Sequence, residues 1–340
     1  MSKIHTFGKI IKNIILMKKT FFYLASVVLL TACNQNSETE NLSEDNSTTS
    51  VSARRSCPSE EIRAELLKND ASARQRYANI ESGIQDFISS GKVLSDGTVD
   101  IPVVVNVLYK TSAENISDAR IAEQIAILNA DFGGTNTDAS KIPTEFSGVK
   151  AGDTKVRFHL VKTVRKATTK TKWGTNDAMK KVSTGGIDAT TPNSYFNLWV
   201  VGNMGGILGY ATFPESAGLW NDGVVIAAPY FGKTGATAPY NLGRTATHEV
   251  GHYLNLRHIW GDATCGNDLV ADTPTQTGAN YGKPAYPTYN TCTGTSRSIM
   301  FMNYMDYVDD AAMFMFSAGQ KARTQSVLTS TGARSGLRVY

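Results

Sequence analysis

The chain has 340 residues, of which 41% are hydrophobic, and a formal net charge of +4. This length allows one large domain or two ordinary ones, and the apolar content is enough for a substantial core. The net charge is small, and Lys and Arg are scattered with no run of five or more, so nucleic acid is not an expected partner. Composition therefore indicates a globular protein and excludes little else.

An export signal is expected at residues 1–33. Lys18 and Lys19 are followed by an apolar run, Phe21 to Leu30, that is too short to span a bilayer. The next residues resemble the lipobox of bacterial lipoproteins, in which the Cys, here Cys33, is acylated. The alternative is an ordinary signal peptide with an incidental Cys. We expect a secreted or surface-anchored lipoprotein of the Gram-negative outer membrane, which contacts the membrane only through its lipid.

Residues 34–56 and 57–98 are expected to differ in character. The first segment is almost entirely Asn, Ser, Thr, Glu and Asp, so it is predicted to be a disordered tether. In the second, a helical pattern from Ser59 to Ser90 carries an apolar stripe but has no evident core of its own. It is therefore expected to pack on another part of the chain, as a prosegment does. The stripe comprises Tyr77, Ile80, Ile84, Phe87 and Ile88.

The main domain is expected at residues 99–340, with an α/β layer structure. Helices are predicted at 118–132, capped by Ser117, and at 317–328, which begins with a Ser-x-x-Gln capping box. Residues 261–294 are rich in Gly, Pro, Thr and Asn and are predicted to be irregular. Strands are predicted at 101–109, 156–160, 196–201, 207–213 and 223–228.

Three of the five histidines, His248, His252 and His258, fall within eleven consecutive residues. On a helix the first two lie one turn apart on the same face, so both can bind one cation, with Glu249 beside them as a general base. His258 supplies a third ligand only if the chain turns sharply after the helix. Asn255 suits that turn, because Asn tolerates the left-handed conformation. The pattern predicts a catalytic zinc site. His159, alone on a predicted strand, is expected to be structural, and His5 lies in the signal segment.

This cluster resembles the extended zinc motif of metzincins, His-Glu-x-x-His-x-x-Gly-x-x-His, with Asn255 in place of the Gly. Together with the downstream run from Met302 to Tyr307, it resembles the pappalysin family. The resemblance covers roughly Ile101 to the C-terminus. It implies a metzincin catalytic domain with a twisted, mostly parallel sheet, a backing helix and a zinc-site helix, divided at a cleft into subdomains 99–258 and 259–340. The plainer alternative is that the histidines only pack on a helix face.

The resemblance also implies roles outside the histidine cluster. Met305 is expected to form an apolar floor beneath the zinc ligands; the alternative is an ordinary core Met. Tyr307 is expected to hydrogen-bond the tetrahedral intermediate. The segment from Gly205 to Phe213 resembles the family's upper-rim edge strand, whose free backbone groups pair with substrate, whereas the alternative is an interior strand.

Family members bind structural calcium in the region that contains Asp262, Asp268 and Asp272. Oxygen ligands from a loop suit Ca²⁺, so Asp268 and Asp272 are expected to bind it, although solvated surface acids fit equally well. Some relatives prefer a basic residue after the scissile bond, through an acidic residue that precedes the Met-turn. Residues 273–291 contain no Asp or Glu. That preference is therefore not expected here.

Three cysteines remain in the exported part, an odd count that suggests one bridge and one thiol with a separate role. Cys265 and Cys292 are expected to form a disulfide that anchors the irregular segment. Cys57 is expected to occupy the fourth zinc position in the precursor, as in the cysteine switch of some metzincins. Proximity to the metal and to Arg54 and Arg55 is expected to favour its thiolate. The alternative is a free or intermolecularly paired Cys.

These residues predict a zinc-dependent endopeptidase, monomeric, made as a latent zymogen and acting on a protein or peptide. Zinc would lower the pKa of a bound water from 15.7 toward about 7, and Glu249 would pass its proton to the leaving amine. One alternative is a zinc hydrolase of a non-peptide amide. Another is an inactive surface binding lipoprotein, against which the intact Glu249 argues.

Overall fold

The computed structural model describes residues 54–91 and 97–338, which lie in the unit Ser52–Tyr340. The predicted signal segment, Cys33, His5 and nearly all of the tether lie outside the described residues. In the part of the chain that is described, no helix has the length and apolar character needed to cross a membrane.

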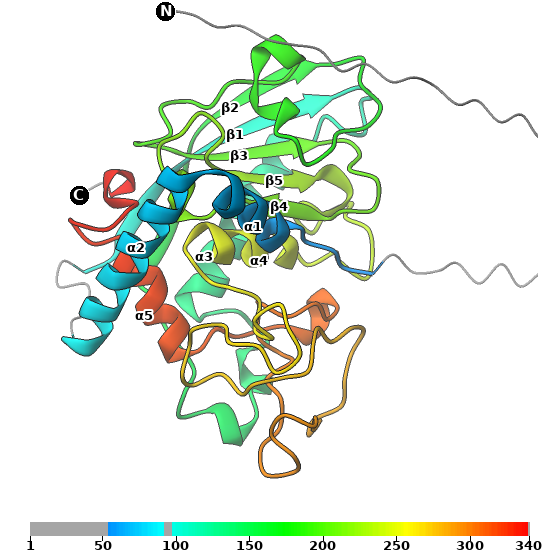
Figure 1. Ribbon diagram of the computed structural model, residues 1–340. Coiled ribbons are helices and arrows are strands. Elements are labelled where there is room, and N and C mark those ends of the chain that lie inside the picture. The colour runs from blue at the N-terminus through cyan, green and yellow to red at the C-terminus, as the bar shows by residue number, and fades with distance from the viewer. Residues whose placement is uncertain (1–53, 92–96, 339–340) are drawn as a thin grey trace, which may run out of the picture. The chain divides into compact units, whose positions relative to one another are not determined.

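A five-stranded sheet with the order β2-β1-β3-β5-β4 forms the frame of the molecule (Figure 1). β1 (Val99–Tyr109) pairs in parallel with β2 (Val156–Ala167) and with β3 (Phe196–Val201). β5 (Val224–Ala227) is parallel to β3, whereas β4 (Gly209–Ala211) is antiparallel to β5 and lies at the edge. The mostly parallel α/β sheet expected from the sequence is confirmed.

β4 is shorter than the predicted strand at 207–213. Gly205 and Gly206, which precede it, have φ angles of 67° and 96°. These left-handed conformations, which suit glycine, turn the chain just before the predicted strand, and the strand itself covers only Gly209–Ala211. The edge position contradicts the alternative of an interior strand.

Two apolar cores lie on opposite faces of the sheet. Leu198 and Val200 of β3 belong to the larger core, and the intervening Trp199 belongs to the smaller one, because alternate side chains of a strand point to opposite faces. The larger core also contains Leu128 of α3 (Asp118–Gly133) and Val250 of α4 (Arg244–Tyr253). Their burial in the same core therefore holds α3 and α4 against this face of the sheet.

The helix predicted over Ser59 to Ser90 is two helices, α1 (Ser59–Asn69) and α2 (Ala71–Ser89). Asp70 has an extended backbone, and its carboxylate accepts hydrogen bonds from the Ser72 and Ala73 backbone N–H groups, which caps α2. Ile84 and Cys57 pack into the larger core, as expected for a segment that packs on another. Ile88, placed in the predicted stripe, is 41% exposed instead.

The C-terminal part is irregular as predicted, with no helix or strand in residues 261–294, all of which are described. α5 (Ala318–Val327) follows, and the predicted capping box of Ser317 and Gln320 is present. Short 3-10 helices lie at Ala139–Lys141, Thr144–Phe146, Ala178–Lys180, Val182–Thr184, Pro214–Ser216, Ala228–Tyr230, Asp310–Ala312 and Ser335–Leu337.

Candidate active site

α4 brings His248 and His252 together as their spacing predicts. All ten residues of the helix are buried, and the two imidazole centroids lie 4.8 Å apart. After the helix, Asn255 has a φ of 72°, the left-handed conformation expected from the sequence. The turn returns the chain so that His258 Nε2 lies 3.1 Å from His252 Nε2.

The three rings present their Nε2 atoms to one point because their Nδ1 atoms are engaged elsewhere. Nδ1 of His248 lies 2.7 Å from the Tyr304 carbonyl, and Nδ1 of His252 lies 2.8 Å from the Leu256 carbonyl. His248 Nε2 is buried and has no hydrogen-bond partner. Burial and the neighbouring histidines hold the pKa of His248 well below its usual value. Neutral imidazoles with a free lone pair are what Zn²⁺ requires.

The third ring has a carboxylate partner, Asp262, to which the sequence interpretation gave no role at the metal site. His258 Nδ1 lies 2.6 Å from Asp262 Oδ1. Such a contact fixes the ring orientation of a metal-binding histidine. Asp262 therefore supports the histidine cluster, and its place four residues after His258 is the sequence signal that would have found it.

Cys57 completes the group. Its Sγ and the ligand nitrogens of His248, His252 and His258 lie within 4.8 Å of one another, and all four residues are buried. Three imidazoles and one thiolate form a donor set that Zn²⁺ binds tetrahedrally. The chemistry of these donors and the unpartnered Nε2 of His248 both fit a metal ion.

The Cys57 thiol is deeply buried, and the two arginines near it in the sequence contact other groups. Burial raises the pKa of the thiol well above its usual value, and the Glu249 carboxylate adds to this effect. Arg55 pairs with Asp310, and Arg54 lies over the Tyr281 ring. Both arginines thus have other partners, and a bound cation is the group that we expect to favour the thiolate.

Glu249 lies directly beneath the prosegment. Its Oε2 accepts hydrogen bonds from Cys57 Sγ at 3.1 Å and from Ser59 Oγ at 3.2 Å. The side chain is buried, and this burial raises its pKa to about 7. The carboxylate is thus occupied by residues that would have to leave before it could accept a proton from water.

Met305 and Tyr307 reach the cluster from the other side. A Cβ built on Gly251 would lie 2.4 Å from Met305 Sδ, so the thioether packs against α4 one residue before His252. The Tyr307 hydroxyl lies 3.1 Å from His258 Nε2, donates to the Cys57 carbonyl and accepts from the Cys57 N–H. Both residues therefore lie beside the histidine cluster, and the roles expected for them stay predictions.

The free edge of β4 is also covered by the segment around Cys57. The Leu208 N–H donates to the Ser56 carbonyl at 3.4 Å, and the Ala211 N–H donates to Ser59 Oγ at 2.9 Å. Donors on an unpaired strand edge are those that an extended peptide would use. In the precursor these two donors are therefore occupied by the segment around Cys57.

Arg55 belongs to the packed segment although its composition groups it with the tether. It is 2% exposed, and its Nη2 lies 2.6 Å from Asp310 Oδ1. The guanidinium also lies 4.9 Å from the centre of the Tyr240 ring. A basic side chain, two residues before Cys57, therefore fills an acidic pocket beside the cluster.

Asp310 is a functional candidate that sequence reasoning missed. The sequence interpretation considered acidic residues only within 273–291, before the Met-turn, whereas Asp310 follows Met305 by five positions. The expectation that the preference for a basic residue does not carry over to this chain stays a prediction, and Asp310 is the acidic residue with which to test it. Asp310 Oδ2 accepts from the Leu242 and Arg244 backbone N–H groups, which hold the carboxylate in place.

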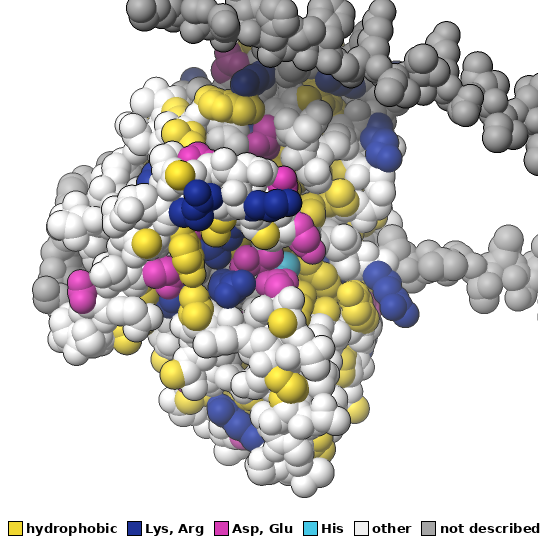
Figure 2. Space-filling view, viewed as in Figure 1, with side chains coloured by type: hydrophobic (Ala, Val, Ile, Leu, Met, Phe, Trp, Pro, Cys, Tyr) yellow, Lys and Arg dark blue, Asp and Glu magenta, His cyan; other side chains and the backbone are white. Residues whose placement is uncertain are grey.

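Among the described residues, ion pairs link the prosegment to the rest of the domain at four points. Figure 2 shows acidic and basic side chains side by side over the region of α1 and α2. In each pair one partner is nearly fully buried, so the charges are matched rather than solvated. The pairs are Arg55–Asp310, Glu60–Arg257, Arg63–Glu215 and Glu81–Arg323.

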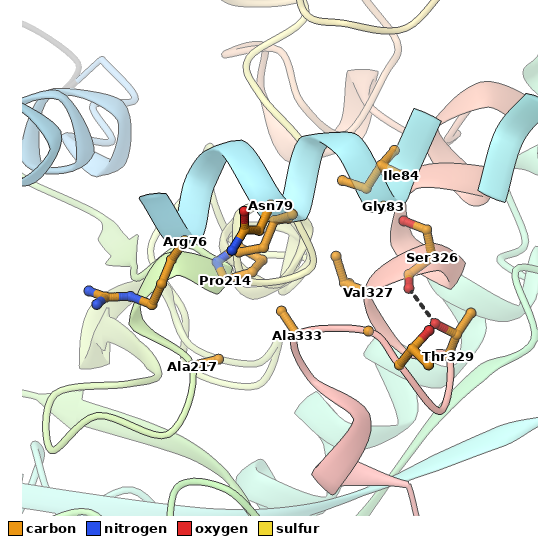
Figure 3. Close-up of a pocket in the computed structure, with 13 residues that line it drawn as sticks. Arg76, Asn79, Gly83, Ile84, Pro214, Ala217, Ser326, Val327, Thr329 and Ala333 are labelled. Carbon is orange, nitrogen blue, oxygen red and sulfur yellow. Dashed lines mark hydrogen bonds between the residues drawn. The ribbon is translucent and has the colours of Figure 1, made fainter. Parts of the chain in front are cut away.

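A cavity of about 350 Å³ separates part of α2 from the domain beneath it. Figure 3 shows α2 along one side and the turn after α5 along the other, with Ile84, Val327 and Ala333 at its border. None of the histidines lines this space. The prosegment therefore packs tightly at the metal cluster and loosely along α2.

The irregular segment contains the predicted disulfide between Cys265 and Cys292, with an S–S distance of 2.05 Å. The two acids proposed for calcium have protein partners. Asp268 accepts from Thr273 Oγ1 and the Val270 N–H, and Asp272 accepts from Ser317 Oγ and the Gly319 N–H. His159 pairs with Asp100 between β2 and β1, away from the cluster.

Comparisons with known proteins agree with this geometry. A family model of Peptidase M43, described as pregnancy-associated plasma protein-A, matches residues 187–329. An extracellular metalloprotease of Verticillium alfalfae is 32% identical over 245 residues, covering 66% of this chain and 77% of that protein. An extracellular metalloprotease of Pyricularia oryzae is 31% identical over 277 residues, covering 80% and 87%.

Solved structures extend the similarity through the segment before β1. A promirolysin mutant of Tannerella forsythia is 39% identical with a TM-score of 0.77, covering 84% of this chain and 98% of that one. Mature mirolysin of the same organism, in complex with a cleaved peptide, is 42% identical with a TM-score of 0.70, covering 72% and 97%. The chain belongs to the pappalysin family, peptidase family M43, of the metzincins, and is a zinc-dependent endopeptidase made as a latent zymogen.

Proposed function

We propose that His248, His252 and His258 hold the catalytic zinc and that Glu249 is the general base. The observation that carries this proposal is the convergence of three Nε2 atoms whose Nδ1 partners are fixed, with the Glu249 carboxylate beside them. When bound there, zinc supplies a Lewis acid that polarises the scissile carbonyl and makes water acidic.

The residues of the chain then move one proton and hold the substrate. Glu249 accepts the proton of the attacking water and donates it to the leaving amine. The Tyr307 hydroxyl, which donates to the Cys57 carbonyl in the precursor, donates instead to the oxygen of the reacting carbonyl. Backbone donors of Leu208 and Ala211 hold the peptide extended along β4.

Three single variants of the activated chain test these roles. Glu249→Ala should retain zinc and lose about 10²–10⁴-fold in turnover, because only the proton transfer is removed. His258→Ala should lose zinc. His159→Ala is the matched control and should change neither, since that ring lies outside the cluster.

Zinc content and cleavage of a casein-derived peptide are the two measurements. Unchanged zinc in His258→Ala would exclude it as a ligand, and near-normal peptidase activity in Glu249→Ala would exclude it as the base. Zinc-dependent cleavage of simple amides without cleavage of peptides would favour a hydrolase of non-peptide amides.

In the precursor, Cys57 is the fourth ligand and excludes the catalytic water. Its Sγ lies in the same cluster as the three nitrogens, and it also contacts Glu249. The prosegment at 57–98, extended upstream to the buried Arg55, must be removed before the domain at 99–340 is active. The promirolysin match covers a larger share of the chain than the mature mirolysin match, which supports this boundary.

Asp310 then selects a basic side chain next to the scissile bond. The support is Arg55, whose guanidinium already lies in this pocket against Tyr240. Asp310→Asn should reduce the ratio of kcat/KM between Arg-containing and Gln-containing peptides by on the order of tenfold or more, since a charged hydrogen bond is lost. An unchanged ratio would exclude Asp310 from recognition.

Two further proposals concern Cys33 and the irregular segment that contains the disulfide. Cys33 carries a lipid anchor, which is checked by detergent partitioning of the unaltered chain against Cys33→Ser.

Calcium at Asp268 and Asp272 stabilises the segment around the disulfide. Burial raises the pKa of Asp268 to about 6, which a nearby cation would offset. A melting temperature that is unchanged by EGTA would exclude the calcium proposal.

A further inference from the structure

Glu215 forms a second buried contact between a carboxylate and a basic side chain of the prosegment. Its side chain is fully buried, and Oε1 accepts from Arg63 Nε at 3.0 Å. Oε2 is also buried but has no hydrogen-bond partner. Arg63, the partner, is 5% exposed and comes from α1, a part of the chain that activation removes.

The surroundings of Glu215 suit the flat guanidinium group of an arginine, and not only a positive charge. The Arg63 Cζ lies 4.1 Å from the centre of the Phe213 ring, so the cation lies over an aromatic face. The Phe213 ring in turn lies 5.2 Å from the His252 ring. Because Phe213 and Glu215 both belong to the catalytic domain, the ring and the carboxylate remain next to the metal cluster after α1 has left.

No neighbouring cation takes the place of Arg63 by hydrogen bonding. Arg334 is near enough for Glu215 to raise its pKa, after the larger effects of burial and Asp222. However, both its Nη atoms donate to Asp222, and its Nε donates to the Tyr253 carbonyl. Removal of the prosegment therefore leaves Glu215 without a donor on either oxygen among the described residues of the domain.

The path of the prosegment relates this site to the scissile bond. Ser56 contacts Leu208 and Ser59 contacts Ala211, so the segment follows β4 toward Phe213. Cys57, at the metal cluster, lies between Arg55 in the Asp310 pocket and Arg63 in the Glu215 site. The two carboxylates thus lie on opposite sides of the reaction centre.

We propose that Glu215, with Phe213, is a second subsite that binds a basic side chain of the substrate on the side of the scissile bond opposite to the Asp310 pocket. This inference rests on the proposed function. From Ser59 to Arg63 the helix advances only about 6 Å, which an extended peptide covers in about two residues. The basic residue should therefore lie about two to four residues from the scissile bond.

Peptide pairs test the subsite on the activated full chain. Every peptide keeps Arg at the position bound by Asp310, and positions two, three and four on the other side carry in turn Arg or citrulline, which has the same shape without the charge. We expect one position at which Arg exceeds citrulline by on the order of tenfold in kcat/KM, mainly through KM. No preference at any position would mean that Glu215 serves only to hold the prosegment, and the proposal fails.

The variant Glu215→Gln tests whether Glu215 is the residue that causes the preference for Arg over citrulline. In this variant the Arg-to-citrulline ratio at that position should fall to near one, while the ratio at the position bound by Asp310 stays as in the unaltered enzyme. A retained preference would overturn the assignment to Glu215. The unaltered enzyme alone decides whether a preference exists, so the test stands even if the variant fails to fold. If the activated chain cut none of these peptides, the proposed function would fail; equal cleavage of all of them would remove only the second subsite.

Discussion

The prosegment and the catalytic domain are held by different forces. The sheet, α3 and α4 are joined by aliphatic and aromatic side chains such as Val105, Leu128 and Val250, which are fully buried. The prosegment adds Ile84 to this core, but among the described residues it is also joined to the domain by four ion pairs, by Cys57 at the metal cluster and by hydrogen bonds to the edge of β4. Charged and coordinate contacts can be exchanged for substrate, whereas an apolar core cannot.

This difference explains how one surface serves both latency and catalysis. The groups that the prosegment engages include those that we propose to act on a peptide, namely Glu249, Tyr307 and the Ala211 N–H. Each contact therefore blocks a function and marks its location at the same time. Variants that alter contacts of the prosegment alone, or of the catalytic domain alone, should separate the effects on latency from those on catalysis.

Cys57→Ala should have the largest effect. Without the thiol the prosegment loses a metal ligand, so the precursor should become active and shortened several-fold earlier than the unaltered chain. Ser56→Ala is the matched control, because Ser56 contacts β4 only through its backbone carbonyl. Time courses of peptidase activity and of the shortened form are measured together. Identical activation kinetics, with a water in place of sulfur at the zinc of the precursor, would contradict the role of Cys57.

Gly251→Ala should damage the catalytic domain itself. The added Cβ would lie 2.4 Å from Met305 Sδ, so the floor beneath the histidines must shift, at a cost of about 1–3 kcal/mol in the free energy of unfolding. Gly148→Ala, where a Cβ would meet nothing within 4 Å, is the control. Thermal unfolding and zinc retention are measured in both precursor and activated forms. Equal melting temperatures for the two variants would mean that Met305 does not pack closely against α4.

Local features of the site could be predicted from residue spacing, whereas contacts between distant segments were predicted only where the family resemblance or the cysteine count pointed to them, as for Cys57 and the disulfide. The spacing of His248 and His252 specifies one face of one helix, and Asn255 specifies a left-handed turn, so both follow from residues close in the chain. The pair of Arg55 and Asp310 joins residues 255 positions apart, and the pair of Arg63 and Glu215 joins residues 152 apart. Nothing in composition or periodicity encodes such contacts, because they depend on how the whole chain packs.

The helix break at Asp70, in contrast, is a local feature that the sequence interpretation missed. The apolar spacing continues from α1 into α2, so periodicity alone predicts a single helix. Asp70 followed by Ala-Ser-Ala is nevertheless a capping sequence, and the Asp70 carboxylate takes up two N–H groups at the start of α2. A search for caps within the helical pattern would have found the break.

Asn255→Gly should lower the stability of the precursor more than that of the activated enzyme, and the difference should be smaller than the effects above. Glycine keeps the left-handed turn but removes the hydrogen bond from Asn255 Nδ2 to Glu81 Oε1, so the precursor should lose about 1–3 kcal/mol and the activated enzyme very little. Asn255→Ala removes the same bond and adds about 1–2 kcal/mol of left-handed strain, which both forms must bear. Melting of the two variants in both forms measures this. If Asn255→Gly lowered the melting temperature of the activated form as much as that of the precursor, the contact with Glu81 would not be a prosegment contact alone.

Gly83→Ala should give the smallest effect, and with the opposite sign. Gly83 lies inside α2, where glycine destabilises a helix by about 0.5–1 kcal/mol relative to alanine. A Cβ there meets nothing within 4 Å, because the residue faces the cavity of about 350 Å³ beneath the helix. The variant should therefore raise the melting temperature of the precursor and slow its activation, while the activated enzyme, which has lost α2, should be unchanged. Gly133→Ala in α3, where the Cβ would lie 3.4 Å from Arg157, compares a helix that both forms retain. A shift in the activated form after Gly83→Ala would show that α2 remains bound after activation.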